Sequence, residues 1–342
     1  MTCLLEALCL IELSASYQTM ARRCPLTYVL SPSGGEGGVR GGATAVNVGA
    51  IFPQTEIGTD LGAIRAFVRA VEEVGYDSIF IADHVLGADP QFHQHPSLAR
   101  YSYKSVVHEP LTLMAYLAAI TTRITLATGI LILPQRQTAL VAKQAAEVDV
   151  LSGGRVRLGI GVGWNEVEYE ALGQDFHTRG GRCAEQIAVM RALWTQEVVN
   201  FHGRWHHITH AGLNPLPVQR PIPIWLGVGS LRTARPPDVA LRRVGRLADG
   251  WCPNIPTNEE GQAIVTQVHR YAKEAGRDPA HLPLEGRVRI GGRPPEDWVK
   301  QVKAWQALGA THVIAEAREG SLAFPDGHIA ALQQFKDVMA RC

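Results

Sequence analysis

The stretch Ile124-Thr-Leu-Ala-Thr-Gly-Ile-Leu-Ile-Leu133 decides the fold. It is apolar at consecutive positions, which is typical of a parallel strand covered by helices on both faces. Residues 138–151 follow with a helical pattern that stops at Ser152-Gly-Gly154, and residues 156–162 form a second apolar run. Together the three segments predict a strand, a helix and a second strand of one parallel sheet.

The same alternation extends outward from this unit in both directions. Strands are expected at 46–52, 78–82, 124–133, 156–162, 223–228, 250–253, 284–290 and 311–316. Helices are expected at 60–74, 110–121, 138–151, 181–195, 238–247, 259–275, 295–308 and 327–340. This α/β repeat without a break in composition predicts a closed (β/α)8 or TIM barrel, as one domain over residues 45–342. A doubly wound open sheet is the alternative, and residues 198–221 are expected to form an irregular excursion or a small hairpin.

Residues 1–44 have a different composition. The apolar run at 4–13 is interrupted by Glu6 and Glu12, and no positive residue precedes it, which argues against a signal peptide or a membrane span. Residues 31–42 then have the Gly- and Ser-rich composition of a flexible linker. We expect residues 1–44 to be a poorly ordered N-terminal extension, with a short helix possible at 4–14.

The charge balance of the chain restricts its partners. The 342 residues include 33 Lys and Arg against 32 Asp and Glu. This balance provides no basic field for nucleic acid and no polybasic patch for an anionic membrane, so a small organic molecule is the expected ligand.

None of the six cysteines forms a C-x-x-C pair, which favours free thiols in a reducing cytoplasm. His93 and His95 lack a third ligand at suitable spacing, so no metal is expected.

In a (β/α)8 barrel the active site lies at the carboxyl ends of the strands. The second predicted strand ends in Asp83-His84. The imidazole can exchange a proton near neutral pH, and Asp83 adds a carboxylate to the same rim, so both are candidate catalytic residues. The alternative is that Asp83 caps a turn and His84 is a satisfied rim residue. The aromatic and histidine content of residues 85–109 favours a substrate-covering lid.

Glycines mark the ends of three other strands. Gly129 interrupts the third strand and indicates a bulge or a close approach to the backbone, or else a packing requirement. Alternating glycines end the fourth strand before Trp164, and bare backbone there can approach a phosphate or a planar ring. The fifth strand ends in Gly227-Val-Gly229-Ser230, a plausible anion cradle of backbone N–H groups. Residues 289–293, Arg-Ile-Gly-Gly-Arg, compete with it as a phosphate site.

The run from Leu126 to Glu166 resembles the luciferase-like monooxygenase superfamily, and within it the branch of coenzyme F420-dependent oxidoreductases. Supporting pieces are Ala82-Asp-His84, Arg179-Gly-Gly-Arg-Cys-Ala-Glu185, Pro223-Ile-Trp-Leu-Gly227 and Ala248-Asp-Gly-Trp251. The resemblance covers about residues 46–255 with specific motifs and the remainder in pattern only.

The resemblance implies a flavin or deazaflavin ring across the barrel mouth, with His84 near its reactive edge. It implies a cis peptide before a residue other than proline at Gly129–Ile130, and a cofactor phosphate held at Gly163 and at Gly229 with Ser230, in preference to residues 289–293. The full set of expected cofactor-binding residues is Thr128, Gly129, Ile130, Gly163, Asn165, Gly227, Gly229 and Ser230. The sequence departs from the family pattern at residues 231–237. These residues lengthen the glycine-rich turn after the fifth strand, which in the family normally leads directly into a helix. The family also implies a homodimer.

Three functions follow as hypotheses. The first is an oxidoreductase that uses F420 to transfer a hydride to or from a small organic substrate, with His84 moving the matching proton. The second is an FMN-dependent monooxygenase that uses reduced flavin and oxygen. The third is a non-catalytic barrel that binds flavin or nothing.

Overall fold

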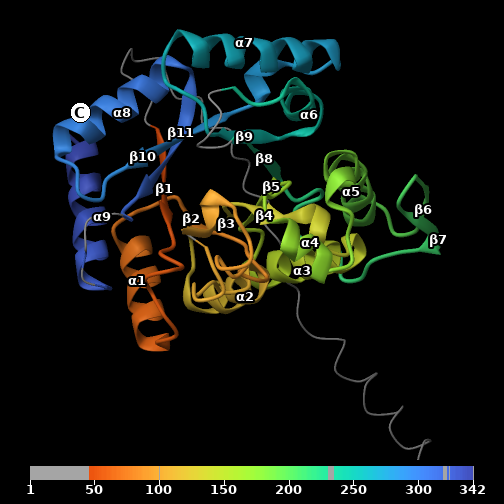
Figure 1. Cartoon of the computed structure of the whole chain (residues 1–342), viewed down its shortest axis with the longest axis horizontal. Coiled ribbons are helices and arrows are strands. Elements are labelled where there is room, and N and C mark those ends of the chain that lie inside the picture. The colour runs from red at the N-terminus through yellow and green to blue at the C-terminus, as the bar shows by residue number, and fades with distance from the viewer. Residues whose placement is uncertain (1–45, 100, 230–234, 319–321, 323, 342) are drawn as a thin grey trace, which may run out of the picture. The chain divides into compact units, whose positions relative to one another are not determined.

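The computed structural model describes residues 46–342 except residues 100, 230–234, 319–321, 323 and 342. The expected N-terminal extension, including the possible helix at 4–14, lies outside the described residues. Figure 1 shows the helices arranged around a sheet of strands. The strands are β1 (Asn47–Ile51), β2 (Ser78–Ile81), β3 (Thr125–Thr128), β4 (Leu131–Ile132), β5 (Val156–Gly161), β6 (Val199–His202), β7 (His207–Ala211), β8 (Ile224–Val228), β9 (Gly250–Pro253), β10 (Leu284–Arg289) and β11 (Ala310–Glu316).

The sheet closes on itself, which confirms the predicted (β/α)8 barrel. The parallel pairs run β1–β2–β3–β5–β8–β9–β10–β11, and β11 pairs back onto β1. The short β4 continues β3 beyond an interruption at Gly129–Ile130 and pairs with β5. The strands therefore fall within the eight predicted ranges or one residue from them. The antiparallel hairpin β6–β7 confirms the small hairpin expected at 198–221.

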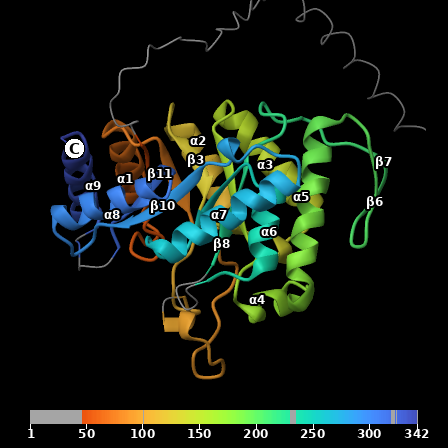
Figure 2. The same ribbon diagram turned by 90° about the horizontal axis from the view of Figure 1, so that it is seen from above.

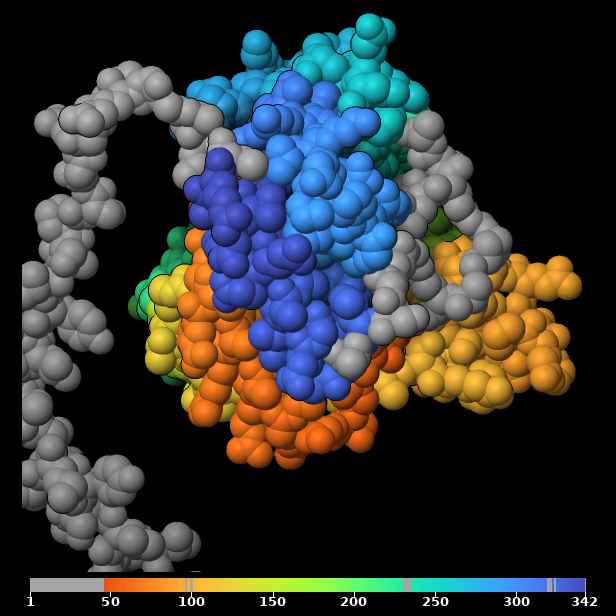
Figure 3. Space-filling model, turned by 90° about the vertical axis from the view of Figure 1, so that its left-hand side faces the viewer, coloured from red at the N-terminus to blue at the C-terminus, as the bar shows by residue number. Residues whose placement is uncertain are grey.

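The helices cover the outside of the barrel. They are α1 (Leu61–Glu73), α2 (Pro110–Ile120), α3 (Thr138–Ser152), α4 (Glu166–Ala171), α5 (Arg179–Thr195), α6 (Asp238–Leu247), α7 (Glu259–Glu274), α8 (Pro295–Ala307) and α9 (Asp326–Met339). α1 illustrates why they form: the Asp60 carboxylate caps its first N–H groups, its apolar face is buried, and Gly75 follows it with a positive φ. α1, α9 and α8 lie side by side on one face (Figure 3). Among the described residues no helix is long and apolar enough to cross a membrane.

The apolar core is divided by the barrel wall. The larger part lies between the strands and the surrounding helices. Inside the barrel the buried apolar cluster is small, and consists of Phe80, Ala127 and Ile314 with Ile51 packed against them. Much of the remaining interior is polar or glycine, so charged side chains share the space that aliphatic residues usually fill in such barrels.

An ion pair occupies the base of this interior. Arg157 on β5 and Glu285 on β10 are both buried, and their side chains approach to 2.8 Å. The Arg157 guanidinium lies 4.7 Å from the ring centre of Phe80 and 4.2 Å from that of Trp225, so cation–π contacts supplement the pair. Burial raises the pKa of Glu285 above its usual 4.5, although Arg157 acts in the opposite direction. Arg157 is therefore needed to keep the desolvated Glu285 carboxylate ionised.

The variant Arg157→Met tests this dependence. We expect it to destabilise the fold by about 3–5 kcal/mol at pH 8, because Glu285 is then a buried charge without its partner. We expect the loss of folding stability in this variant to be smaller at pH 5 than at pH 8. The folded state retains a proton on Glu285 that the unfolded state releases above pH 4.5, so stability falls as pH rises. Thermal or urea unfolding at the two pH values measures this.

The double variant Arg157→Met/Glu285→Gln is the matched control. It removes the unpaired charge, so we expect it to recover part of the stability at pH 8 and to lose the pH dependence. Equal destabilisation of the single variant at both pH values would contradict the account.

Candidate active site

The carboxyl ends of the barrel strands form one rim, here called the mouth. His84 follows β2, Ile130 follows β3, Trp164 follows β5 and Gly229 follows β8. The loop of residues 85–109 projects from this side of the barrel, where α4 also lies (Figure 2). Closure of the barrel therefore gathers residues that are far apart in the sequence.

The Gly129–Ile130 peptide is cis, as the resemblance implied. The Ile130 side chain lies across the backbones of β5 and β8. A Cβ at Gly161 would come within 2.5 Å of an Ile130 carbon, and one at Gly227 within 2.8 Å. These two glycines thus make room for Ile130, which is a packing reason that the sequence pattern alone did not reveal. Gly129, Ile130 and Gly227 remain half-buried and border the mouth.

Two of the expected cofactor-binding side chains are engaged within the protein. Thr128 is buried, and its hydroxyl donates to the carbonyl of Gly159 at 2.7 Å. Asn165 is buried as well, and its amide donates to the carbonyl of Leu86 at 3.2 Å. Thr128 thus joins the end of β3 to β5, and Asn165 joins the residues after β5 to the start of the 85–109 loop.

The expected phosphate-binding positions are backbone turns. Gly163 has a φ of +66° and Gly229 a φ of +89°, a conformation that favours glycine. A Cβ at Gly229 would also lie 2.6 Å from the carbonyl oxygen of Asn254. Gly229 is exposed, while Ser230 lies outside the described residues. The structure thus explains these glycines by backbone geometry and leaves the N–H group of Gly229 at an exposed position.

His84 is held by a buried carboxylate. Its Nδ1 lies 3.0 Å from Oε2 of Glu168 on α4, a side chain with no exposed surface. Because a carboxylate accepts, Nδ1 carries the proton and Nε2 has no hydrogen-bond partner among the described residues. Oε1 of Glu168 accepts from the backbone N–H groups of Val85 at 2.6 Å and Leu86 at 3.2 Å. Glu168 therefore fixes both the imidazole and the start of the 85–109 loop.

The Asp83 side chain points away from the mouth, toward Arg136. Its Oδ1 accepts from Arg136 at 2.7 Å, and its Oδ2 accepts from Arg136 at 3.2 Å and from the backbone N–H of Ile132 at 2.9 Å. The side chain is fully buried. Burial raises the pKa of Asp83, and the Arg136 guanidinium opposes that shift. These contacts favour a positioning role, in which Asp83 joins the end of β2 to the segment that follows the cis peptide.

Aromatic rings surround His84. The ring of Tyr101 lies 4.5 Å from the imidazole between centres, and that of Trp164 lies 5.6 Å away. The Tyr101 hydroxyl accepts from Arg318 at 2.9 Å, which joins the 85–109 loop to the chain after β11. Tyr101 is one of the aromatic residues of 85–109 from which the sequence predicted a lid, and the sequence indicated no role for Glu168 or Arg318. Glutamates alternate at 166, 168 and 170, so the pattern contains no signal that selects Glu168.

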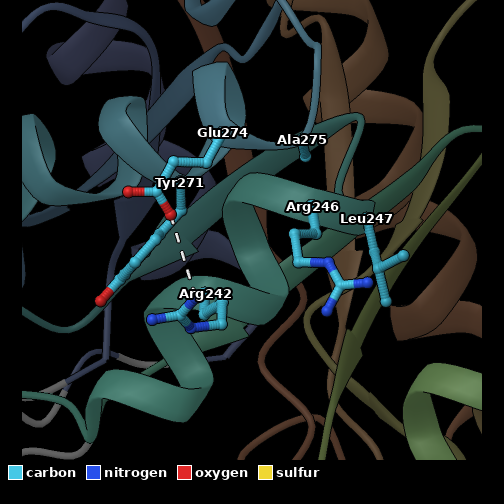
Figure 4. A pocket seen from close by; sticks show the side chains of 6 residues that line it. All are labelled: Arg242, Arg246, Leu247, Tyr271, Glu274 and Ala275. Atoms are coloured by element: carbon cyan, nitrogen blue, oxygen red, sulfur yellow. Dashed lines mark ion pairs between the residues drawn. The ribbon is translucent and has the colours of Figure 1, made fainter.

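A separate cavity of about 470 Å³ lies in the helix layer between α6 and α7. Figure 4 shows its lining residues, Arg242, Arg246, Leu247, Tyr271, Glu274 and Ala275. They come from the later parts of both helices. Helices of a (β/α)8 barrel run back toward the amino ends of the strands, so this cavity lies away from the mouth. We assign it no part in the site.

The variant Glu168→Ala tests the anchoring role of this carboxylate. We expect a loss of about 2–4 kcal/mol in stability, because two backbone N–H groups and the imidazole lose their acceptor. We also expect faster proteolytic cleavage within residues 85–109. Glu170→Ala, an exposed change on the same helix, is the matched control. Identical melting temperatures and cleavage rates for the two variants would exclude the anchoring role.

Comparison with known proteins agrees with this geometry. Residues 40–319 match the family model of the luciferase-like monooxygenases. A Mycobacterium bovis protein of uncharacterized activity is 36% identical over 280 residues, which cover 80% of this chain and 92% of the relative. The F420-dependent glucose-6-phosphate dehydrogenase of Amycolatopsis mediterranei is 31% identical over 268 residues, covering 74% of this chain and 73% of the relative.

Structural similarity supports the same fold. The EDTA monooxygenase of Chelativorans sp. BNC1 superposes with a TM-score of 0.70 at 13% identity, covering 87% of this chain and 94% of the other. An identity this low shows the fold alone. The family model, in contrast, spans most of the chain and includes every strand of the barrel. The chain belongs to the luciferase-like monooxygenase family of oxidoreductases.

Proposed function

We propose that the protein is a coenzyme F420-dependent oxidoreductase that transfers a hydride to or from a small organic substrate. The observation that carries the proposal is the His84 imidazole, fixed by the buried Glu168 and flanked by aromatic rings at the mouth. The similarity to an F420-dependent dehydrogenase at 31% identity supports this choice of cofactor.

The residues at the mouth fit a planar ring with a phosphate tail. Half-buried backbone at Gly129, Ile130 and Gly227 borders the barrel opening, and Ile130 provides an apolar surface. Gly163 and Gly229, with Ser230 beyond the described residues, supply the proposed phosphate contacts through backbone N–H groups. When bound, the deazaflavin supplies a carbon that accepts or donates the hydride.

The chain's own residues handle the proton. His84 Nε2 takes a proton from the substrate or returns one, while Glu168 holds Nδ1–H and so keeps the ring in one tautomer. Positioning residues support this group. Asp83 fixes the end of β2, Thr128 fixes the end of β3, and Asn165 fixes the start of the 85–109 loop. His84 thus remains the proposed catalytic residue. Asp83, expected to be catalytic, and Thr128 and Asn165, expected to bind the cofactor, are instead proposed as positioning residues.

An FMN-dependent monooxygenase is the second candidate, because the family as a whole is described as luciferase-like monooxygenases. The same mouth would then shelter the reduced flavin from water. A non-catalytic barrel is the third candidate, and the fixed His84 speaks against it. The homodimer and the cytoplasmic location stay predictions.

Titration with the two cofactors separates these candidates. We expect F420 to bind at least roughly tenfold more tightly than FMN, a difference of about 1.4 kcal/mol. Isothermal titration of the purified chain measures both affinities under one set of conditions. Tighter binding of FMN would overturn the choice of F420, and binding of neither cofactor would support the non-catalytic barrel.

The variant His84→Asn tests the proton role. We expect turnover to fall by about 10²–10⁴-fold, because the proton transfer loses its positioned base or acid. Affinity for F420 should stay nearly unchanged, since the proposed cofactor contacts are backbone groups on other strands. His93→Asn, an exposed histidine of the 85–109 loop, is the control. Full turnover by His84→Asn would exclude this role.

A further inference from the structure

A stripe of charged residues runs along the interior face of β10. Leu284, Gly286 and Val288 face outward; a Cβ at Gly286 would lie 2.3 Å from the Trp305 ring of α8. The alternate positions Glu285, Arg287 and Arg289 therefore face into the barrel. Glu285 is paired with Arg157 at the base. The two arginines lie successively closer to the mouth.

Three arginines surround one carboxylate at this side of the mouth. Glu316 ends β11, and its Oε1 accepts from Arg318 at 3.0 Å. Its Oε2 lies 3.8 Å from Arg287 and 3.9 Å from Arg289, which is too far for a hydrogen bond. Among the described residues neither of these two guanidinium groups makes a hydrogen bond. Their donors are therefore available to another acceptor.

The cluster formed by Glu316 with Arg287, Arg289 and Arg318 has more positive than negative charges. Burial acts to raise the pKa of Glu316, but the three arginines outweigh it and hold that pKa below its usual value. Glu316 is thus ionised at neutral pH, and the cluster carries an excess of two positive charges. Glu316 is only 6% exposed, whereas Arg287 is 31% and Arg289 is 37% exposed. Interior-facing side chains with that much exposed surface border a solvent-filled opening.

The cluster opens to the same mouth as His84. Arg318 donates to the Tyr101 hydroxyl, and the Tyr101 ring lies against the His84 imidazole. The proposed cofactor phosphate contacts, at Gly163 and Gly229, follow β5 and β8. β10 lies two strands beyond β8 in the barrel, with β9 between them. The arginines are therefore separate from the phosphate contacts and close to the reaction centre.

We propose that Arg287 and Arg289 bind an oxyanion of the substrate, a carboxylate or a phosphate. This inference rests on the proposed function in that it names the substrate class of the same site. A guanidinium group offers paired N–H donors that match the two oxygens of such a group. Glu316 holds both arginines toward the mouth without occupying their donors. The oxyanion then fixes one end of the substrate while His84 acts at the other.

Binding of simple anions to the chain without cofactor tests the site independently of any activity. Inorganic phosphate and acetate are titrated by calorimetry against the wild type and against Arg287→Gln and Arg289→Gln. We expect at least one of the anions to bind the wild type and each variant to weaken that binding by roughly 10- to 100-fold, as for the loss of a charge-assisted hydrogen bond. The stronger anion identifies carboxylate or phosphate as the preferred group. Melting temperatures of the variants check that they fold.

Arg293→Gln is the matched control. Arg293 follows the same strand, is exposed and is absent from the ion pairs of Glu316, so the variant removes the same charge without touching the cluster. We expect it to bind the anion as the wild type does. An equal loss in Arg293→Gln would overturn the proposal, because it would indicate a general electrostatic field and not a site. Absence of anion binding to the wild type would overturn it as well.

Turnover of matched alcohols extends the test to the reaction. Pairs such as glycerol 3-phosphate with glycerol, and lactate with 2-propanol, differ in the oxyanion. We expect Arg289→Gln to raise KM for the anionic member by roughly 10- to 100-fold and to leave the neutral member and the affinity for F420 unchanged. Weaker F420 binding with unchanged anion binding would assign the arginines to the cofactor and overturn the proposal. Failure of F420 to bind the wild type, with anion binding intact, would reject the proposed function alone.

Discussion

Closure of the strands into a barrel is the constraint on which the rest of the structure depends. A closed sheet has no free edge, and its parallel strands all end on one rim. Residues from the ends of β2, β3, β5, β8, β10 and β11 therefore meet, although more than 200 residues separate His84 from Glu316. Closure also creates an interior of limited volume. The Ile130 side chain enters it across Gly161 and Gly227, and it leaves no room for a Cβ at either position.

Charge distributed along the interior distinguishes the two halves of the mouth. On the side of β2 and β5, the His84 imidazole is held by Glu168 among aromatic rings. On the side of β10 and β11, arginines outnumber the one carboxylate they surround. The His84–Glu168 contact is buried, so water screens it less than it would at the surface. The opening is thus bordered by the His84 imidazole after β2 and by an arginine cluster at the ends of β10 and β11.

Much of the fold was predictable because its signals are local. Apolar runs such as 124–133 and helical periodicity such as that of 238–247 depend on neighbours within a few residues, and the strands and long helices lie close to their predicted ranges. α4 escaped prediction because its six residues are too few to show a periodic pattern. His84 was identified by its place after a strand. Asp83, one residue earlier, was expected on the same rim, yet successive side chains alternate in direction and Asp83 is directed into the protein toward Arg136.

The sequence by itself determined the barrel, the family and the strand ends at which the candidate site lies, because periodicity and motif spacing are properties of the chain alone. Only the tertiary structure decided which glutamate holds His84, why Gly161 and Gly227 lack side chains, and that Arg287 and Arg289 face a common opening. Each of these depends on contacts between residues distant in sequence. Such contacts arise from the closed geometry and leave no trace in the local pattern of residues.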